Sequence, residues 1–237
     1  MVTTVRLVLA AGSIVAGLAL SGCSDSTADA TADPIDIAIV GDSFTSGTPL
    51  GGEDDANWTQ VLDTLLDSTE VPHTVSVESG NGSGYSSPGV RGLTFAQMAD
   101  TVIESETDLV IVFGSVNDAG EPEESYAADV AATLAGIRER VPSATLLVVG
   151  PAWVDARIPP EVERLEEVLR VESLRAEADF VNPLEKRWFF DPNRSNVVGL
   201  ISTDGLHPTD AGHRYLAERM AELVILELRT RAADAAP

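Results

Sequence analysis

The chain has almost nothing with which to cross-link itself or to bind a metal. It contains a single cysteine, Cys23, so no disulfide can form within the chain. Its three histidines, His73, His207 and His213, follow neither the HExxH pattern nor another common metal-ligand spacing. A cysteine-based metal site and a catalytic thiol are therefore both disfavoured.

Positive charge is also scarce. The sequence has 15 lysine and arginine residues against 38 aspartate and glutamate residues, a formal net charge of -23, and Lys186 is the only lysine. A surface of this sign repels phosphate backbones and anionic lipid headgroups. Nucleic-acid binding and electrostatic docking on a membrane are disfavoured, and the simplest role of the charge is solubility.

The apolar stretch near the start of the chain is short for a membrane-spanning helix. Residues 7–20 are apolar, whereas a span needs roughly 20 residues. With Arg6 as the only charge before it, this stretch predicts a signal peptide over residues 1–22. The segment ends in Leu-Ser-Gly followed by Cys23, which resembles a bacterial lipobox, where the signal is removed and the cysteine is lipidated.

The lipobox implies an extracytoplasmic lipoprotein held on the cell membrane by a lipid on Cys23. The alternative is an ordinary signal peptide cut nearby, with Cys23 incidental. Residues 23–34 are small and acidic and have no periodicity, which is typical of a flexible tether. We expect the folded domain to occupy residues 35–237 and to be a monomer.

Beyond the tether, short apolar runs alternate with stretches of helical periodicity. The predicted strands are 35–40, a stretch around Val75 and Val77, 108–113, 145–150 and 180–181, and the predicted helices are 57–66, 94–103, 121–140, 160–178 and 209–231. This alternation indicates crossover connections and a parallel sheet. We predict an α/β fold, a flavodoxin-like three-layer α/β/α sandwich with a five-stranded parallel sheet, whose strand order the pattern does not define.

Four small or polar clusters follow predicted strands or precede the last predicted helix. They are Gly41-Asp42-Ser43, residues 80–86, residues 114–118, and Asp204-Gly205-Leu206-His207. The carboxyl ends of parallel strands lie along one edge of a sheet, where open α/β folds bind ligands. We therefore expect the first three clusters to meet at this edge, where the fourth can join them.

The residue types in these clusters suit nucleophilic catalysis. Ser43 can attack a carbonyl if a base takes its proton, and His207 is the natural base. Asp204, three residues earlier, can orient the imidazole, as in a Ser-His-Asp triad. The backbone N–H groups of Ser43 and Gly84 and the side-chain amide of Asn117 can donate to an oxyanion.

These blocks resemble the SGNH (GDSL-like) hydrolases, whose signature has a GDS-type serine block, an oxyanion glycine, a GxND block and a DxxH block. The first and last blocks match closely, with Phe44 in place of the usual leucine. In the third block Asn117 is present, but Ser115 stands where the family has glycine. In the second block three glycines compete, and we favour Gly84 over Gly80 and Gly82 because a small or polar pair follows it.

Taken singly, each block has a simpler explanation, because Gly-Asp-Ser is a common turn and both DxxH and Asn-Asp can cap helices. Together and in this order they favour catalysis. We expect Asp42 and Asp118 to be structural, His213 to be a packing or surface residue, and His73 to have no function. Trp58 and Trp188 are expected in the core or at its rim, as is Trp153, for which a place in the substrate pocket is the alternative.

The resemblance implies a serine esterase that forms an acyl-enzyme and needs no metal or other cofactor. An acylated carbohydrate or a short-chain ester is the expected substrate, although the sequence does not choose among deacetylase, lipase, thioesterase and acyltransferase. A long-chain lipase would need a broad apolar rim, which 5% aromatic residues do not suggest. A non-catalytic glycan-binding lipoprotein and an acyltransferase on the same fold remain as alternatives.

Overall fold

The computed structural model describes residues 34–69, 71–114, 116–190 and 198–234. The predicted signal peptide, Cys23 and nearly all of the tether lie outside these residues. The strands are β1 (Ile35–Gly41), β2 (His73–Ser79), β3 (Leu109–Phe113), β4 (Thr145–Val149) and β5 (Asp179–Val181). The α-helices are α1 (Ser43–Ser46), α2 (Trp58–Asp67), α3 (Phe95–Val102), α4 (Glu123–Arg140), α5 (Pro160–Arg175) and α6 (Asp210–Asp234), and a 3-10 turn covers Asp54–Ala56.

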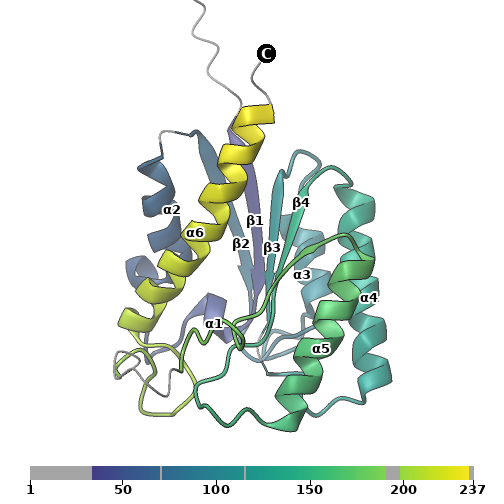
Figure 1. The fold of residues 1–237 in the computed structure, drawn as a ribbon, viewed down its shortest axis with the longest axis vertical. Coiled ribbons are helices and arrows are strands. Elements are labelled where there is room, and N and C mark those ends of the chain that lie inside the picture. The colour runs from purple at the N-terminus through teal and green to yellow at the C-terminus, as the bar shows by residue number, and fades with distance from the viewer. Residues whose placement is uncertain (1–33, 70, 115, 191–197, 235–237) are drawn as a thin grey trace, which may run out of the picture. The chain divides into compact units, whose positions relative to one another are not determined.

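The five strands form one parallel sheet in the order β2-β1-β3-β4-β5, which confirms the predicted fold class. Gly41, the last residue of β1, pairs with Ser79 of β2 and Phe113 of β3. The segments that follow β1, β2 and β3 therefore leave the sheet at the same edge. Helices α2 and α6 cover one face, and α3, α4 and α5 cover the other (Figure 1).

The composition of the central strand β3 explains why the sheet is covered by helices on both faces. All five of its residues are buried. Leu109, Ile111 and Phe113 pack toward α2 and α6, while Val110 and Val112 pack toward α3, α4 and α5. Each fully buried apolar side chain contributes about 1.5–3 kcal/mol, so a strand without polar side chains is stable only between two helical layers.

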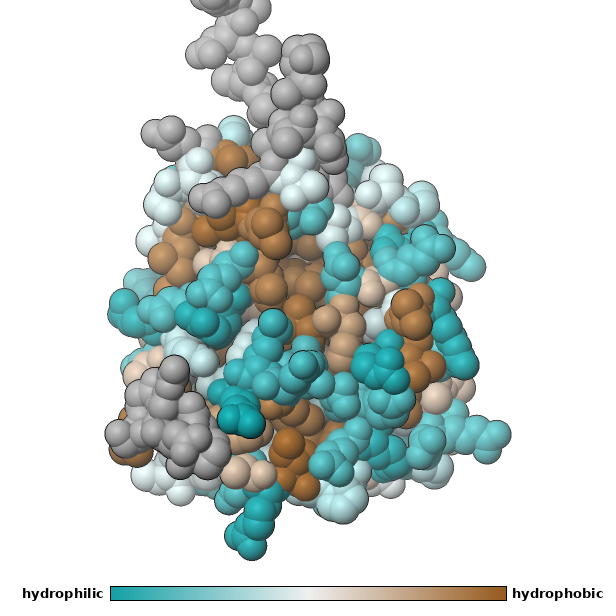
Figure 2. Space-filling model, in the orientation of Figure 1, coloured by the Kyte–Doolittle hydropathy of each residue, from teal (hydrophilic) through white to brown (hydrophobic). Residues whose placement is uncertain are grey.

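The outer surface is rich in polar side chains, and Figure 2 shows hydrophilic residues over much of one face. In the described parts of the chain, no helix combines the length and the apolar character needed to cross a bilayer. Helix α5 ends at Arg175, three residues before its predicted end at 178. The reason is local, because Glu177 adopts a φ of 53°, which an α-helix cannot continue.

The start of α6 is fixed to the loop after α1. His213 is 1% exposed, and its Nδ1 accepts a hydrogen bond from the Trp58 N–H at 3.3 Å. Its ring also hydrogen-bonds to the Gly51 backbone and leaves no room for a side chain at Gly52. The Asp210 carboxylate accepts from the Gly52 N–H at 2.9 Å. Burial lowers the pKa of His213 to about 4, so the ring is neutral, as expected of a packing residue.

This burial predicts a pH dependence of stability. Unfolding returns the His213 pKa to its ordinary value near 6.5, so the unfolded chain binds a proton that the folded chain rejects. Stability should fall as the pH decreases from about 6.5 to about 4, by at most about 3 kcal/mol from this group. Thermal unfolding of wild type and His213→Gln between pH 7.5 and 4.5 measures it. The gap in melting temperature should shrink toward low pH, and a constant gap would contradict the assignment.

Candidate active site

The first functional segment is the turn from β1 into α1. The Asp42 carboxylate caps this short helix by accepting the Phe44 N–H at 2.9 Å. Ser43 is the first helical residue, and its N–H donates to no group among the described residues. Phe44 replaces the family's leucine without disturbance, since its ring packs edge-on against Phe113 and Phe189, each 6.0 Å away between centroids.

Two hydrogen bonds connect Ser43, His207 and Asp204 in series. The Ser43 Oγ lies 3.0 Å from the His207 Nε2. The His207 Nδ1 lies 2.6 Å from the Asp204 Oδ2. The structure thus brings together the three residues that the sequence analysis proposed as a triad, although 164 positions separate Ser43 from His207. A base within reach of the serine and a carboxylate orienting that base are the arrangement required for nucleophilic attack.

Asp204 is held by a network of its own. Its Oδ1 accepts the backbone N–H groups of Leu206 at 2.9 Å and His207 at 3.0 Å, and the Ser202 Oγ–H at 2.6 Å. The hydroxyl of Ser202 and then the His207 ring hold the pKa of Asp204 well below its usual range. The carboxylate therefore stays ionised beside the imidazole. Sequence reasoning missed Ser202, whose signal was a serine two residues before the aspartate.

The glycine loop after β2 corrects one expectation. The Gly84 N–H, proposed for the oxyanion, already donates to the Ser87 carbonyl at 2.8 Å, and the Gly80 N–H donates to the Gly41 carbonyl at 3.0 Å. The Gly82 N–H has no hydrogen bond among the described residues. Gly82 has a φ of 77°, a conformation that favours glycine. Of the three competing glycines, Gly82 has the free amide.

Asn117 and Asp118, on the loop after β3, hold the glycine loop in place through hydrogen bonds. The Asn117 Nδ2 donates to the Ser83 carbonyl at 2.7 Å and to the Asp42 Oδ2 at 3.1 Å. Both amide protons therefore have acceptors in this structure. The neighbouring Ser115 lies outside the described residues, so its departure from the family pattern has no structural account.

Asp118 accepts three successive backbone N–H groups, those of Tyr85, Ser86 and Ser87, at 2.8–3.1 Å. Burial raises its pKa, and these three N–H groups oppose the shift. Gly84 is needed here for space, because a Cβ at this position would lie 2.3 Å from the Asp118 Oδ2. Asp118 shapes the loop, and Asp42 caps α1 and accepts from Asn117, so both have the structural roles that we expected.

The remaining candidates are placed as follows. Trp58 and Trp188 are 0% and 4% exposed and belong to the core. Trp153 is half-buried on the loop after β4, at the active-site edge of the sheet. His73 is the first residue of β2, an outermost strand of the sheet. It lies beside Asp63, at the amino ends of the strands and away from the active site.

In this doubly wound sheet, a serine, an imidazole and a carboxylate are linked in series by hydrogen bonds at the carboxyl ends of the strands. This is the architecture of a serine hydrolase. The chain belongs to the GDSL-like lipase/acylhydrolase family, whose sequence profile matches residues 39–215. It is 38% identical over 195 residues to the GDSL lipase Rv0518 of Mycobacterium tuberculosis, covering 81% of this chain and 82% of that one. The chain is accordingly an enzyme of the SGNH type, an ester hydrolase.

Solved structures with the same fold are more distant in sequence. The esterase EstA from Pseudoalteromonas sp. matches with a TM-score of 0.65 at 17% identity, covering 82% of this chain and 98% of that one. The family 3 carbohydrate esterase of Clostridium thermocellum matches with a TM-score of 0.63 at 22% identity, covering 84% and 99%. These similarities establish the α/β fold.

Replacing Asn117 with alanine tests the third block. The variant loses the amide that holds the Ser83 carbonyl and faces Asp42, so both the glycine loop and oxyanion stabilisation should suffer. We expect turnover of a simple ester to fall by roughly 10²–10³. Melting curves recorded in parallel should show that the variant stays folded. A turnover near that of wild type in the folded variant would remove Asn117 from the site.

Proposed function

We propose that this enzyme removes short acyl groups from hydroxyls of carbohydrates through a covalent acyl-enzyme. The observation that carries the proposal is the pair of hydrogen bonds from Ser43 through His207 to Asp204, at 3.0 and 2.6 Å. No other described serine has an imidazole and a carboxylate in series in this way.

In the first half of the reaction, the Ser43 Oγ attacks the ester carbonyl carbon and its proton passes to the His207 Nε2. The resulting imidazolium is stabilised by the Asp204 carboxylate. Collapse of the tetrahedral intermediate breaks the bond to the alcohol oxygen, which takes the proton from His207. In the second half, water attacks the acyl-enzyme by the same route and releases the acid and free Ser43.

The oxyanion needs donors that are not already used. The free N–H groups of Ser43 and Gly82 meet this requirement. Asn117 can contribute if one amide proton leaves its longer bond to Asp42, at 3.1 Å, and turns to the substrate oxygen. We therefore assign the oxyanion hole to Ser43, Gly82 and Asn117, with Gly82 in place of Gly84.

Polar surroundings favour a hydroxyl-rich substrate with a short acyl group. An open groove of about 520 Å3 lies beside α1, and its lining includes Ser46, Asn57, Thr59, Gln60, Asp54 and Asp55. Carboxylates, amides and hydroxyls of this kind bind sugar hydroxyls and do not favour a long acyl chain. The structural neighbour from Clostridium thermocellum is itself a carbohydrate esterase.

The test combines a covalent probe with a substrate panel. A fluorophosphonate should label the Ser43 peptide of the folded wild type and leave Ser43→Ala unlabelled. Acetyl esters of sugars should be hydrolysed faster than octanoyl esters of the same sugars, because the polar lining of the groove beside α1 gives a long acyl chain little apolar contact. An unlabelled Ser43 would favour the alternative of a non-catalytic glycan-binding protein. Acyl transfer to added sugar that outruns hydrolysis would favour the acyltransferase.

We also propose that the enzyme acts outside the cytoplasm, held by a lipid on Cys23. The support is the sequence before Ile35, with its signal-like stretch and lipobox. When the chain is expressed with its native leader in a bacterium that processes lipoproteins, wild type should partition into the detergent phase. Cys23→Ser should move to the aqueous phase with unchanged esterase activity. Aqueous partitioning of an unmodified wild type would rule out the anchor.

A further inference from the structure

Trp153 stands apart from the other two tryptophans. Trp58 and Trp188 are buried in the core, whereas Trp153 is half-buried on the loop that joins β4 to α5. Strand β4 pairs with β3, and β3 pairs with β1, all in parallel. The loop therefore leaves the same sheet edge as the segments that carry Ser43 and Asn117. The Trp153 ring is therefore partly exposed to solvent at the edge of the sheet that carries the active site.

The loop that carries Trp153 is anchored to the core by the residue after it. Val154, the next residue, packs against the apolar cluster that contains Phe44 and Phe189. Phe44 follows Ser43 directly, and its ring centroid lies 6.3 Å from that of His207. The chain at 153–154 thus packs on the apolar cluster to which Phe44 belongs.

The indole ring of Trp153 is also held by a hydrogen bond from its N–H group. The Trp153 Nε1–H donates to the Arg157 carbonyl at 3.2 Å, and the Arg157 N–H donates to the Asp155 Oδ1 at 2.8 Å. Trp153 takes part in none of the ring pairs formed by the described residues. Its indole is oriented by one hydrogen bond, and its face is not used by another aromatic side chain.

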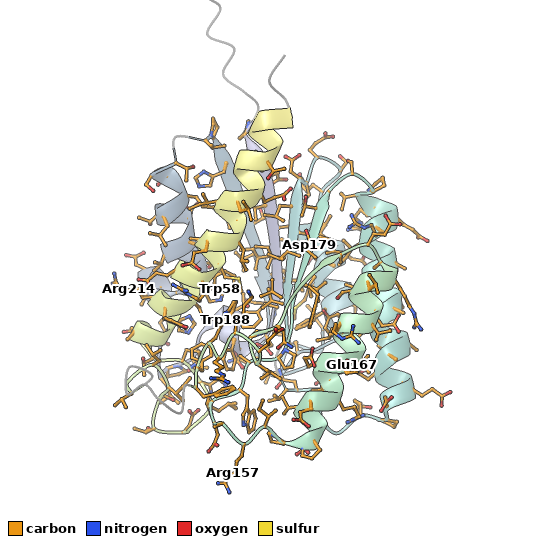
Figure 3. All side chains as sticks on the ribbon, viewed as in Figure 1. Trp58, Arg157, Glu167, Asp179, Trp188 and Arg214 are labelled. Atoms are coloured by element: carbon orange, nitrogen blue, oxygen red, sulfur yellow. The ribbon has the colours of Figure 1, made fainter. Side chains whose placement is uncertain are left out.

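Two charged residues lie on the same loop as Trp153. Asp155 and Arg157 are both exposed, and Figure 3 shows Arg157 extending from this loop away from the body of the protein. Arg157 forms no ion pair within the described residues, although the protein has a large excess of carboxylates. A loop that carries an aromatic ring together with a guanidinium and a carboxylate suits a ligand that is apolar on its flat face and rich in hydroxyls at its rim, which describes a sugar ring.

We propose that Trp153 is a specificity-determining residue against which the sugar ring of the ester packs, with Asp155 and Arg157 hydrogen-bonding to sugar hydroxyls. This inference rests on the proposed carbohydrate esterase function and extends it to the alcohol side of the substrate. The loop does not touch the reacting atoms, so it acts on binding and leaves the bond-forming steps to the triad.

The experiment compares two substrates that share an acetyl group. For Trp153→Ala and wild type, kcat/KM is measured with acetylated xylotetraose and with ethyl acetate, whose leaving group is small and carries no ring. The ratio of the first value to the second should fall about tenfold in the variant, the size expected when an aromatic contact of about 1.4 kcal/mol is lost. The fall should come from KM, and Trp153→Phe should recover most of it.

The outcomes separate this inference from the function on which it rests. A wild type active on both substrates, with an unchanged ratio in Trp153→Ala, would overturn the role of Trp153 alone. An equal loss on both substrates would assign Trp153 to loop structure and would also overturn it. A wild type active on ethyl acetate but inactive on acetylated xylotetraose and other acetylated sugars would overturn the carbohydrate assignment, and the role of Trp153 with it.

Discussion

The structure depends on a contact between the two ends of the domain, the hydrogen bond from Ser43 to His207. Neither end could hold this geometry alone. Ser43 is set by the end of β1 and the capped turn of α1. His207 is set by the turn that precedes α6, and His213 fixes the beginning of α6 to α2 and to the loop after α1. The parallel sheet makes the contact achievable, because it brings the ends of distant strands to one edge.

Carboxylates hold the loops at this edge. Asp42 accepts the Phe44 N–H, Asp118 accepts three N–H groups of the glycine loop, and Asp204 accepts those of Leu206 and His207. A carboxylate that accepts backbone N–H groups fixes the path of the chain, since leaving such donors unpaired when buried costs about 1–3 kcal/mol each. One of the three also orients the imidazole. The acidic composition thus serves local structure as well as solubility.

The sequence predicted the parts of this structure that depend on local patterns of residues. The run Leu109–Phe113 has no polar side chain and could only be a central strand. Ser43 and Asn117 were found because polar residues directly after buried strands must lie at one edge of a parallel sheet. Asp204 and His207 were found because a serine nucleophile needs a base and a carboxylate to orient it. The strand order could not be read, because neighbours in a sheet are chosen by tertiary packing. The choice among Gly80, Gly82 and Gly84 depended on which amide the folded loop leaves free. Asp118, on the loop after β3, fixes the path of the glycine loop by accepting three of its N–H groups. The end of α5 was placed late because the left-handed conformation of Glu177 leaves no pattern in the sequence.

The central claim is that Ser43 and His207 act as one catalytic unit. A double-mutant cycle measures this most directly, with kcat for a simple acetyl ester determined for Ser43→Ala, His207→Ala and the double variant. Residues that act as a unit lose most of the rate when either is removed. The account predicts that the double variant is no slower than either single variant by more than a few-fold. Losses that multiply, or a His207→Ala variant that keeps the rate of wild type, would contradict it.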